Sequence, residues 1–329
     1  MVEIVTGRHN PLIDPHLAVW EWPIPLYLFL GGLVAGLMVL GGLQRLSGRA
    51  AEGRALPRTA LLYSPLLLSL GMLLLLLDLA HPAHVFRFFL TFKPASPMSW
   101  GSWILLIVYP VQVLLLAMPG GLERFGGPLA ALDRPWQALR RAAERRERII
   151  AWAAVLTGSL LGLYTGVLLG VNAARPLWNT SLLAPLFLAS GLSAGCAFAL
   201  LMRPTGPEER SLLRWDTGLL AAELLILLLL LLTLLAGPLA RQEAARLLLS
   251  GPFAGTFWVL VVALGILLPL WLEAREIARK PAPAWLAPVL VLAGGLALRF
   301  LIVCAGQASH LPEADILASA AEVLSNTLP

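Results

Sequence analysis

The stretch from His16 to Gly36, HLAVWEWPIPLYLFLGGLVAG, decides how the rest of the chain is interpreted. It begins polar, passes Trp20 and Trp22, and becomes an apolar, glycine-rich run that continues to about Leu43. Tryptophan is enriched where a transmembrane helix meets the membrane surface. The stretch therefore predicts a first membrane-spanning helix with Tyr27 about one and a half turns inside the interface. Two interpretations remain open for Tyr27: part of a site, or part of an ordinary interfacial belt.

The composition is that of an integral membrane protein. Of the 329 residues, 58% are hydrophobic and 13% charged, whereas soluble domains carry about 25% charged residues. Eight apolar stretches are long enough to cross about 30 Å of hydrocarbon. No β-barrel alternation is visible, so the backbone must be satisfied within a helical bundle. The predicted spans are 23–44, 59–80, 100–118, 149–173, 178–202, 212–237, 254–273 and 283–305.

Basic residues gather on one side of the predicted bundle. The loops between spans 1–2, 3–4, 5–6 and 7–8, with their flanks, hold 17 of the 24 Lys and Arg residues. Cytoplasmic loops carry such an excess, so these loops are predicted to be cytoplasmic and both termini periplasmic. The predicted location is the bacterial cytoplasmic membrane, and the basic balance does not indicate nucleic-acid binding.

Four regions follow from this topology. We expect an outer N-terminal segment (1–22), a first four-helix bundle (23–173), a second four-helix bundle (174–305) and an outer amphipathic C-terminal segment (306–329). The pattern of the basic cytoplasmic loop 119–148 predicts an amphipathic helix on the membrane surface. The alternative, which we favour, is a charged loop that only sets the topology.

The positions of His and Cys argue against bound haem, iron–sulfur clusters or other metals. A haem in a bundle needs histidines projecting inward from helices. All five histidines fall in outer segments or at their edges: His9, His16, His81, His84 and His310. The two cysteines, Cys196 and Cys304, do not form a CxxC pair, which disfavours a cluster or structural zinc site in this chain.

Ionisable and phenolic residues within spans are candidates for function, because burying them in a membrane is costly. Tyr27, Asp78, Tyr164 and Arg299 are expected at similar depth in the outer half of the bundle. A phenol, a carboxylate and a guanidinium suit a quinone headgroup, which needs hydrogen-bond donors and proton exchange. Glycine-rich helix faces leave room for its tail. Alternatively, Asp78 and Arg299 only pair with each other and both tyrosines are interfacial.

Glu223 and Asp216 lie deeper, in the sixth span. They could belong to a proton path from the cytoplasm to the quinone site. Because they are seven residues apart on one helical face, they could equally form one polar pair.

Four motifs carry a resemblance to a known family: WEWPIPLYLFLGGLVAG in the first span, LDLAHP with SPMSWGSW (77–82 and 96–103), YTGVLLGVNAARPLWN (164–179) and LRFLIVCAGQ (298–307). With these motifs in this order, the protein resembles the NrfD-like (PsrC-like) membrane subunit of the polysulfide reductase family. The resemblance implies an eight-helix protein without haem that binds a quinone such as menaquinone. It also implies a four-cluster ferredoxin-like iron–sulfur subunit and a molybdopterin catalytic subunit on the outer face.

The family's quinone ligands carry over only in part. Tyr164 matches the tyrosine of the fourth span, whereas Tyr27 and Ile24 stand where the family has a histidine and an asparagine. The expected quinone-binding set is Tyr27, Tyr164, His16, Asn172 and Trp22. Asp78 would exchange protons, and Arg299 would hold Asp78 ionised or relay charge.

The expected function is electron exchange between membrane quinone and the iron–sulfur partner, with possible coupling to proton translocation. A secondary transporter and a purely structural membrane anchor are the alternatives. The choice of terminal substrate is encoded in the partner subunits.

Overall fold

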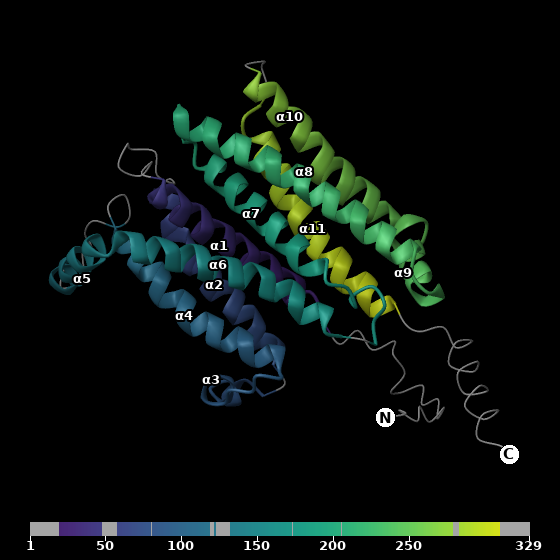
Figure 1. The fold of residues 1–329 in the computed structure, drawn as a ribbon, viewed down its shortest axis with the longest axis horizontal. Coiled ribbons are helices and arrows are strands. Elements are labelled where there is room, and N and C mark those ends of the chain that lie inside the picture. The colour runs from purple at the N-terminus through teal and green to yellow at the C-terminus, as the bar shows by residue number, and fades with distance from the viewer. Residues whose placement is uncertain are drawn as a thin grey trace.

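The computed structural model describes residues 20–47, 58–79, 81–118, 122, 132–172, 174–204, 206–278 and 283–309. These ranges are helical and contain no strand. Figure 1 shows the long helices running side by side in one elongated bundle. The membrane-length helices are α1 (Pro23–Leu46), α2 (Arg58–Asp78), α4 (Pro97–Ala117), α6 (Glu147–Gly170), α7 (Leu183–Leu201), α8 (Pro207–Leu235), η3 (Thr256–Leu267) continuing as α10 (Leu268–Ile277), and α11 (Leu286–Ala308).

The eight predicted spans are confirmed in number and order, and their ends shift by five residues or fewer. Proline explains two of the starts. Pro23 and Pro97 occupy the first turn of α1 and α4. A backbone N–H in the first turn has no hydrogen-bond acceptor within the helix, so proline, which lacks this N–H, loses no hydrogen bond there. The helix α4 therefore begins three residues before the apolar run that predicted it.

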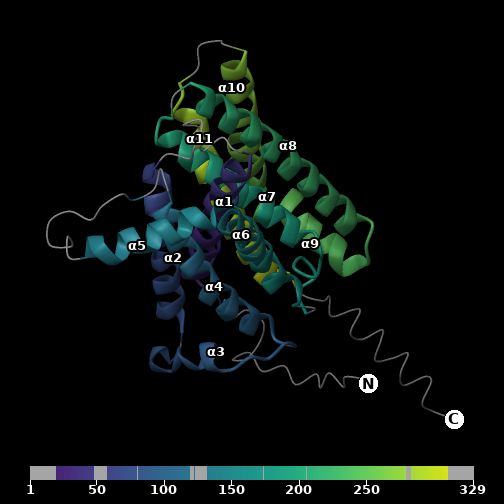
Figure 2. The same cartoon turned by 60° about the vertical axis from the view of Figure 1, so that its left-hand side comes forward.

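Four shorter helices lie outside the spans. They are η1 (Pro82–His84), α3 (Arg87–Leu90), α5 (Asp133–Arg145) and α9 (Leu239–Leu249). The predicted amphipathic helix of the basic loop corresponds to α5, which projects sideways from the bundle where α6 begins (Figure 2). Its buried Trp136 donates a hydrogen bond from Nε1 to the Leu122 carbonyl, 2.8 Å away. The other three helices were not predicted.

The first helix is the centre of the bundle. In the most apolar 18 residues of α1, 83% of the residues are buried, compared with 33% for α2 and α8, each of which exposes several leucines. α1 packs against α2, α6, α7 and α11. Because α1 contacts helices from both halves of the sequence, the division into two four-helix bundles stays a prediction.

Glycines allow α1 and α7 to approach closely. A Cβ at Gly36 would overlap the backbone carbonyl of Gly191, and one at Gly195 would lie 2.7 Å from the Gly36 carbonyl carbon. Small residues at such crossings bring two backbones into contact, which drives helix association in membranes. This explains the glycine run that follows Tyr27.

The two ends of the bundle differ in charge. Arg45, Arg203, Arg214 and Arg275 lie where α1 and α10 end and where α7 passes into α8, together with the arginines of α5. We call this the arginine-rich end. At the opposite end, Trp20 exchanges two 2.9 Å backbone hydrogen bonds with the Gln307 side chain, which joins the start of α1 to the end of α11.

The seventh span departs from regular α-helix. Over Thr256–Leu267 it is a π-helix, in which Gly265 packs against the backbone of Gly294 on α11. The backbone hydrogen bonds of a π-helix join residues five apart, one more than in an α-helix. The side chains of α10 therefore point in directions that a period of 3.6 residues does not predict.

Candidate functional site

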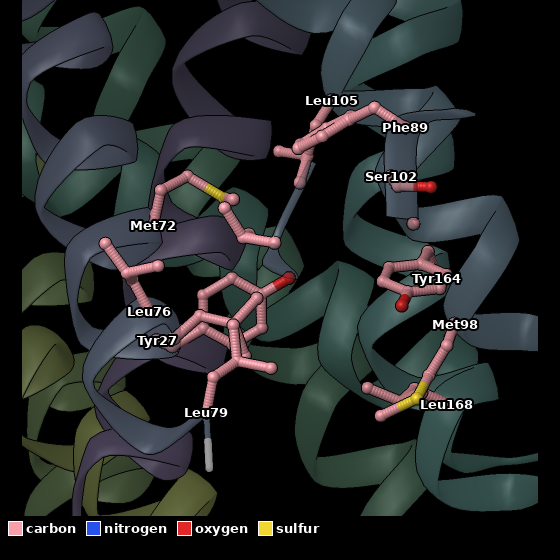
Figure 3. Close-up of a pocket in the computed structure, with 13 residues that line it drawn as sticks. Tyr27, Met72, Leu76, Leu79, Phe89, Met98, Ser102, Leu105, Tyr164 and Leu168 are labelled. Atoms are coloured by element: carbon pink, nitrogen blue, oxygen red, sulfur yellow. The ribbon is translucent and has the colours of Figure 1, made fainter. Parts of the chain in front are cut away.

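One apolar cavity lies toward the end opposite the arginine-rich end. It has a volume of about 110 Å³ and is enclosed by α1, α2, the η1–α3 segment, α4 and α6. Figure 3 shows the lining side chains converging on this space. They are mostly aliphatic and sulfur-containing: Met72, Leu75, Leu76, Leu79, Val85, Met98, Leu105 and Leu168, with Phe89, Gly101, Ser102, Tyr27 and Tyr164.

Two phenols supply the polar atoms that face the cavity. Tyr27 on α1 is 4% exposed and Tyr164 on α6 is 7% exposed. Both phenols line this space: the Tyr27 hydroxyl points toward Tyr164 (Figure 3), and the Tyr164 hydroxyl lies against Gly101 of α4. The Ser102 hydroxyl is already engaged, because it donates to the Ser99 carbonyl at 2.8 Å. Within the described part of the chain, neither phenol makes a hydrogen bond, although a buried tyrosine hydroxyl usually finds a partner.

Gly101 positions Tyr164. The phenol of Tyr164 lies directly against the α4 backbone at Gly101, where a Cβ would be 2.7 Å from Cε1 and closer still to Cζ and the hydroxyl. Any larger residue would displace the ring. Gly101 lies in the SPMSWGSW motif, but no local pattern in the sequence predicts this contact.

A second cavity, lined mainly by polar and charged residues, adjoins the first. It has a volume of about 510 Å³ and shares Leu79 and Met98 with the apolar cavity. Its other lining residues are basic, imidazole or hydroxyl groups: His81, His84, Arg87, Lys93, Thr91, Ser96 and Ser99. Asp78 ends α2 directly before Leu79 and lines neither cavity. The apolar cavity is thus bordered on one side by groups that can exchange protons.

Several predicted quinone ligands lie elsewhere. Trp22 precedes α1 and is 56% exposed. Asn172 follows α6 and accepts a backbone hydrogen bond from Arg175, away from the cavity lining. His16 falls outside the described residues. Of the four members of the predicted set that the structure describes, Tyr27 and Tyr164 lie at the same cavity.

The predicted interaction of Arg299 with Asp78 is wrong. The Arg299 guanidinium is 1% exposed and donates to Ser190 Oγ (2.8 Å) and to the Phe187 carbonyl (3.0 Å), both on α7. It also stacks over the Phe187 ring, and the Glu223 carboxylate on α8 lies close enough to interact with it electrostatically. The reason is the face of α11 on which Arg299 lies: that face packs against α7, whereas Asp78 belongs to α2.

Asp216 and Glu223 do not form one polar pair with each other. Glu223 lies beside Arg299 and Ser190, whereas Asp216 accepts a 2.5 Å hydrogen bond from Ser193 and lies near Glu273 of α10. Seven residues place the two acids two turns apart, too far for direct contact. Glu273 was missed from the sequence, where it stands at the end of an apolar run without a recognisable motif.

The fold and the cavity define a multi-pass α-helical membrane protein with an apolar, phenol-bearing cavity near one end of its bundle. Among the described residues, no group of three or more His, Cys, Asp or Glu could hold a metal ion. The chain matches the family model described as "Polysulphide reductase, NrfD" over residues 10–310. It therefore belongs to the NrfD family, as the sequence motifs predicted.

Individual relatives agree with this assignment. Protein NrfD of Escherichia coli (strain K12) is 32% identical over 307 residues, covering 88% of this chain and 95% of that protein. One of the polysulfide reductase chains of Wolinella succinogenes is 31% identical over 304 residues, covering 88% and 94%. A putative membrane subunit of dimethyl sulfoxide reductase from Halobacterium salinarum is 27% identical over 206 residues, covering 60% and 45%.

Proposed function

We propose that this protein is the quinone-reactive membrane subunit of an oxidoreductase complex and that the apolar cavity holds the quinone ring. The observation that carries the proposal is the pair of buried phenols, Tyr27 and Tyr164, which line one cavity and make no hydrogen bond within the described part of the chain. A quinone ring offers two carbonyl oxygens and flat apolar faces. The cavity offers two donors and apolar walls, so the residues present fit that group.

The residues would act by position and proton exchange. Tyr164, held against Gly101, would donate a hydrogen bond to one ring oxygen, and Tyr27 would donate to the other. Met72, Leu76 and Leu105 would exclude water from the ring faces. A bound quinone supplies two-electron, two-proton redox chemistry. The imidazoles of His81 and His84 line the adjoining cavity, where protons would pass between the quinone and water, and Asp78, next to Leu79 in the chain, would exchange protons with them.

The complex is inferred from the relatives. Their names describe a component of polysulfide reductase and a membrane subunit of a dimethyl sulfoxide reductase. We infer partners of the same kind here: an iron–sulfur subunit and a molybdopterin catalytic subunit. The iron–sulfur subunit would dock at the end that carries His81, His84 and Lys93, since the proposed quinone cavity lies nearest that end.

The orientation follows from charge. The arginine-rich end would face the cytoplasm, as the positive-inside rule requires, and the cavity would face the periplasm. The membrane would be the bacterial cytoplasmic membrane. A proton path through Asp216 and Glu223 stays a prediction.

The test is Tyr164→Phe in the complex isolated with its partner subunits. Loss of the hydroxyl should lower quinol-linked turnover at least tenfold and leave assembly intact, because the ring still fills its place beside Gly101. Tyr109→Phe is the matched control, since the Tyr109 hydroxyl contacts Ser69 at 3.2 Å and does not line the cavity. Unchanged turnover in Tyr164→Phe would remove this residue from the site.

A further inference from the structure

A third cavity lies at the arginine-rich end, where α1 ends and α8 begins (Figure 1). It has a volume of about 600 Å³. The proposed quinone cavity lies toward the opposite end of the bundle and shares no lining residue with it. The side chains that give the third cavity its character are polar, charged or aromatic: Gln44 of α1, with Glu208, Arg210, Ser211, Arg214 and Trp215 of α8.

Two exposed arginines, Arg210 and Arg214, line this cavity. They stand four residues apart on α8, about 6 Å along the helix axis, and therefore on one face. Within the described part of the chain, neither side chain makes a hydrogen bond or an ion pair. By contrast, Arg45 at the same end donates to the Glu147 carboxylate at 3.2 Å. With the one lining carboxylate, Glu208, the two guanidinium groups give the cavity wall a net charge of +1.

The face of α8 that carries the two arginines continues as an exposed apolar strip. Ala221, Leu225 and Leu228 follow Arg214 at helical spacing, and all three side chains are exposed. Arg214 and Leu225 are separated by about 16 Å along the helix. One leaflet is about 15 Å deep, half of the hydrocarbon thickness of about 30 Å. The cationic cavity wall therefore lies at the head of an apolar strip that is about one leaflet long.

Trp215 places the cavity at the membrane surface. Its indole lines the cavity and is 47% exposed. Tryptophan is enriched at the level of the lipid headgroups, where one part of the ring is in contact with hydrocarbon and the indole N–H with water. A cavity at this depth is accessible to headgroups, and the strip below it is accessible to acyl chains.

We propose that this cavity binds the headgroup of an anionic phospholipid, with the acyl chains along residues 221–228 of α8. The lipid phosphate would accept hydrogen bonds from Arg210 and Arg214, whose guanidinium groups match phosphate geometry. Basic pockets beside transmembrane helices suit such headgroups. A free phosphate ion would satisfy the arginines equally well but would leave the apolar strip without a role, so charge and apolar surface together favour a lipid.

Native mass spectrometry of the full-length protein, purified in detergent and mixed with defined lipids, tests the proposal independently of any quinone. Phosphatidylglycerol should bind about tenfold more tightly than phosphatidylcholine, whose headgroup carries no net charge. Arg210→Gln and Arg214→Gln should each weaken phosphatidylglycerol binding about fivefold, the contribution of one basic residue near an anionic lipid surface, and together about 25-fold. Glu208→Gln should strengthen binding, because it removes the negative charge from the cavity wall.

Arg145→Gln combined with Arg148→Gln is the matched control for the double arginine variant. Both side chains are exposed at the arginine-rich end and lie outside the cavity lining, so the control removes the same charge. It should leave phosphatidylglycerol affinity unchanged. Thermal unfolding in detergent without added lipid should give the parent Tm for both double variants, because exposed substitutions change stability little.

Three outcomes would overturn the proposal. Equal affinity for phosphatidylglycerol and phosphatidylcholine would show that the headgroup charge is not recognised. Equal loss of affinity in the two double variants would assign the effect to general attraction between anionic lipid and a basic surface. Displacement of phosphatidylglycerol by an equal concentration of inorganic phosphate would assign the cavity to a free anion.

Discussion

Gly101→Ala tests how tightly the α4 backbone positions the Tyr164 phenol. The new Cβ would lie 2.7 Å from Cε1 and closer to Cζ and the hydroxyl, whereas ordinary carbon contacts begin near 3.4 Å. The ring must therefore withdraw by about 1 Å. Misplacing a positioning group by this distance can cost about 10²-fold in rate. We expect quinol-linked turnover of the isolated complex to fall by about one to two orders of magnitude.

The assay follows quinol-dependent reduction of the complex by stopped-flow absorbance, beside thermal unfolding of the same sample. Overpacking costs about 1–3 kcal/mol, so Gly101→Ala should lower the Tm by only a few degrees. Gly218→Ala is the matched control, because a Cβ at Gly218 meets open space and should leave turnover unchanged.

A double variant separates displacement of the phenol from general damage. If Gly101→Ala acts through the Tyr164 hydroxyl, adding it to Tyr164→Phe should lower turnover by no more than about twofold, since interacting residues are not additive. Wild-type turnover in Gly101→Ala would refute the reasoning. The same large loss in both backgrounds would also refute it.

Three further predictions concern stability and side-chain packing. Arg299→Met should lower the free energy of unfolding by about 3–5 kcal/mol, measured by denaturant unfolding, because it leaves the buried Glu223 carboxylate without a nearby positive charge. Adding Glu223→Gln should restore part of this loss. Equal stability of the single and double variants would contradict an interaction between the two residues. Gly36→Ala should lower the Tm more than Gly31→Ala, since a Cβ at Gly36 meets the rigid carbonyl of Gly191, whereas one at Gly31 makes only ordinary contact with the Thr165 side chain. A Tm within about one degree of the parent would argue against that contact. Gly306→Ala should displace the adjacent indole and shift the tryptophan emission, and an unchanged spectrum would count against that packing.

The sequence correctly predicted the features that depend on crossing a membrane. Apolar run length predicted all eight spans, and proline positions explain why some begin earlier than hydropathy suggests. The amphipathic character of the basic loop predicted α5. Tyr27 and Tyr164 were predicted to lie at one depth, and the structure places both at one cavity.

The depth of a residue in the membrane does not tell which neighbouring helix its side chain faces. For this reason the contacts between site residues could not be predicted from the sequence. Arg299 and Asp78 were expected to interact because they share a depth, but their helices face different partners. Asn172 and Trp22 were included in the expected quinone-binding set because they lie near the outer surface, but neither lines the cavity. The role of Gly101 depends on a contact between α4 and α6 that no local pattern encodes.

Glu273 illustrates a different limit. Its direction depends on the π-helix over Thr256–Leu267, which shifts the register of α10. A period of 3.6 residues, applied across the seventh span, cannot place this carboxylate beside Asp216. The sequence therefore did not predict that Asp216 neighbours Glu273, and of its two alternatives the structure does not show the Asp216–Glu223 pair.

The central claim is that a quinone ring occupies the cavity between Tyr27 and Tyr164. Photolabelling of the isolated complex with an azido-quinone, followed by peptide mass spectrometry, tests it most directly. The label should appear on peptides that line the cavity, in α2 near Met72–Leu79, in α4 near Met98–Leu105 and in α6 near Tyr164, and excess unlabelled quinone should suppress it. Competable label confined to α8, α10 and α11 would contradict the account.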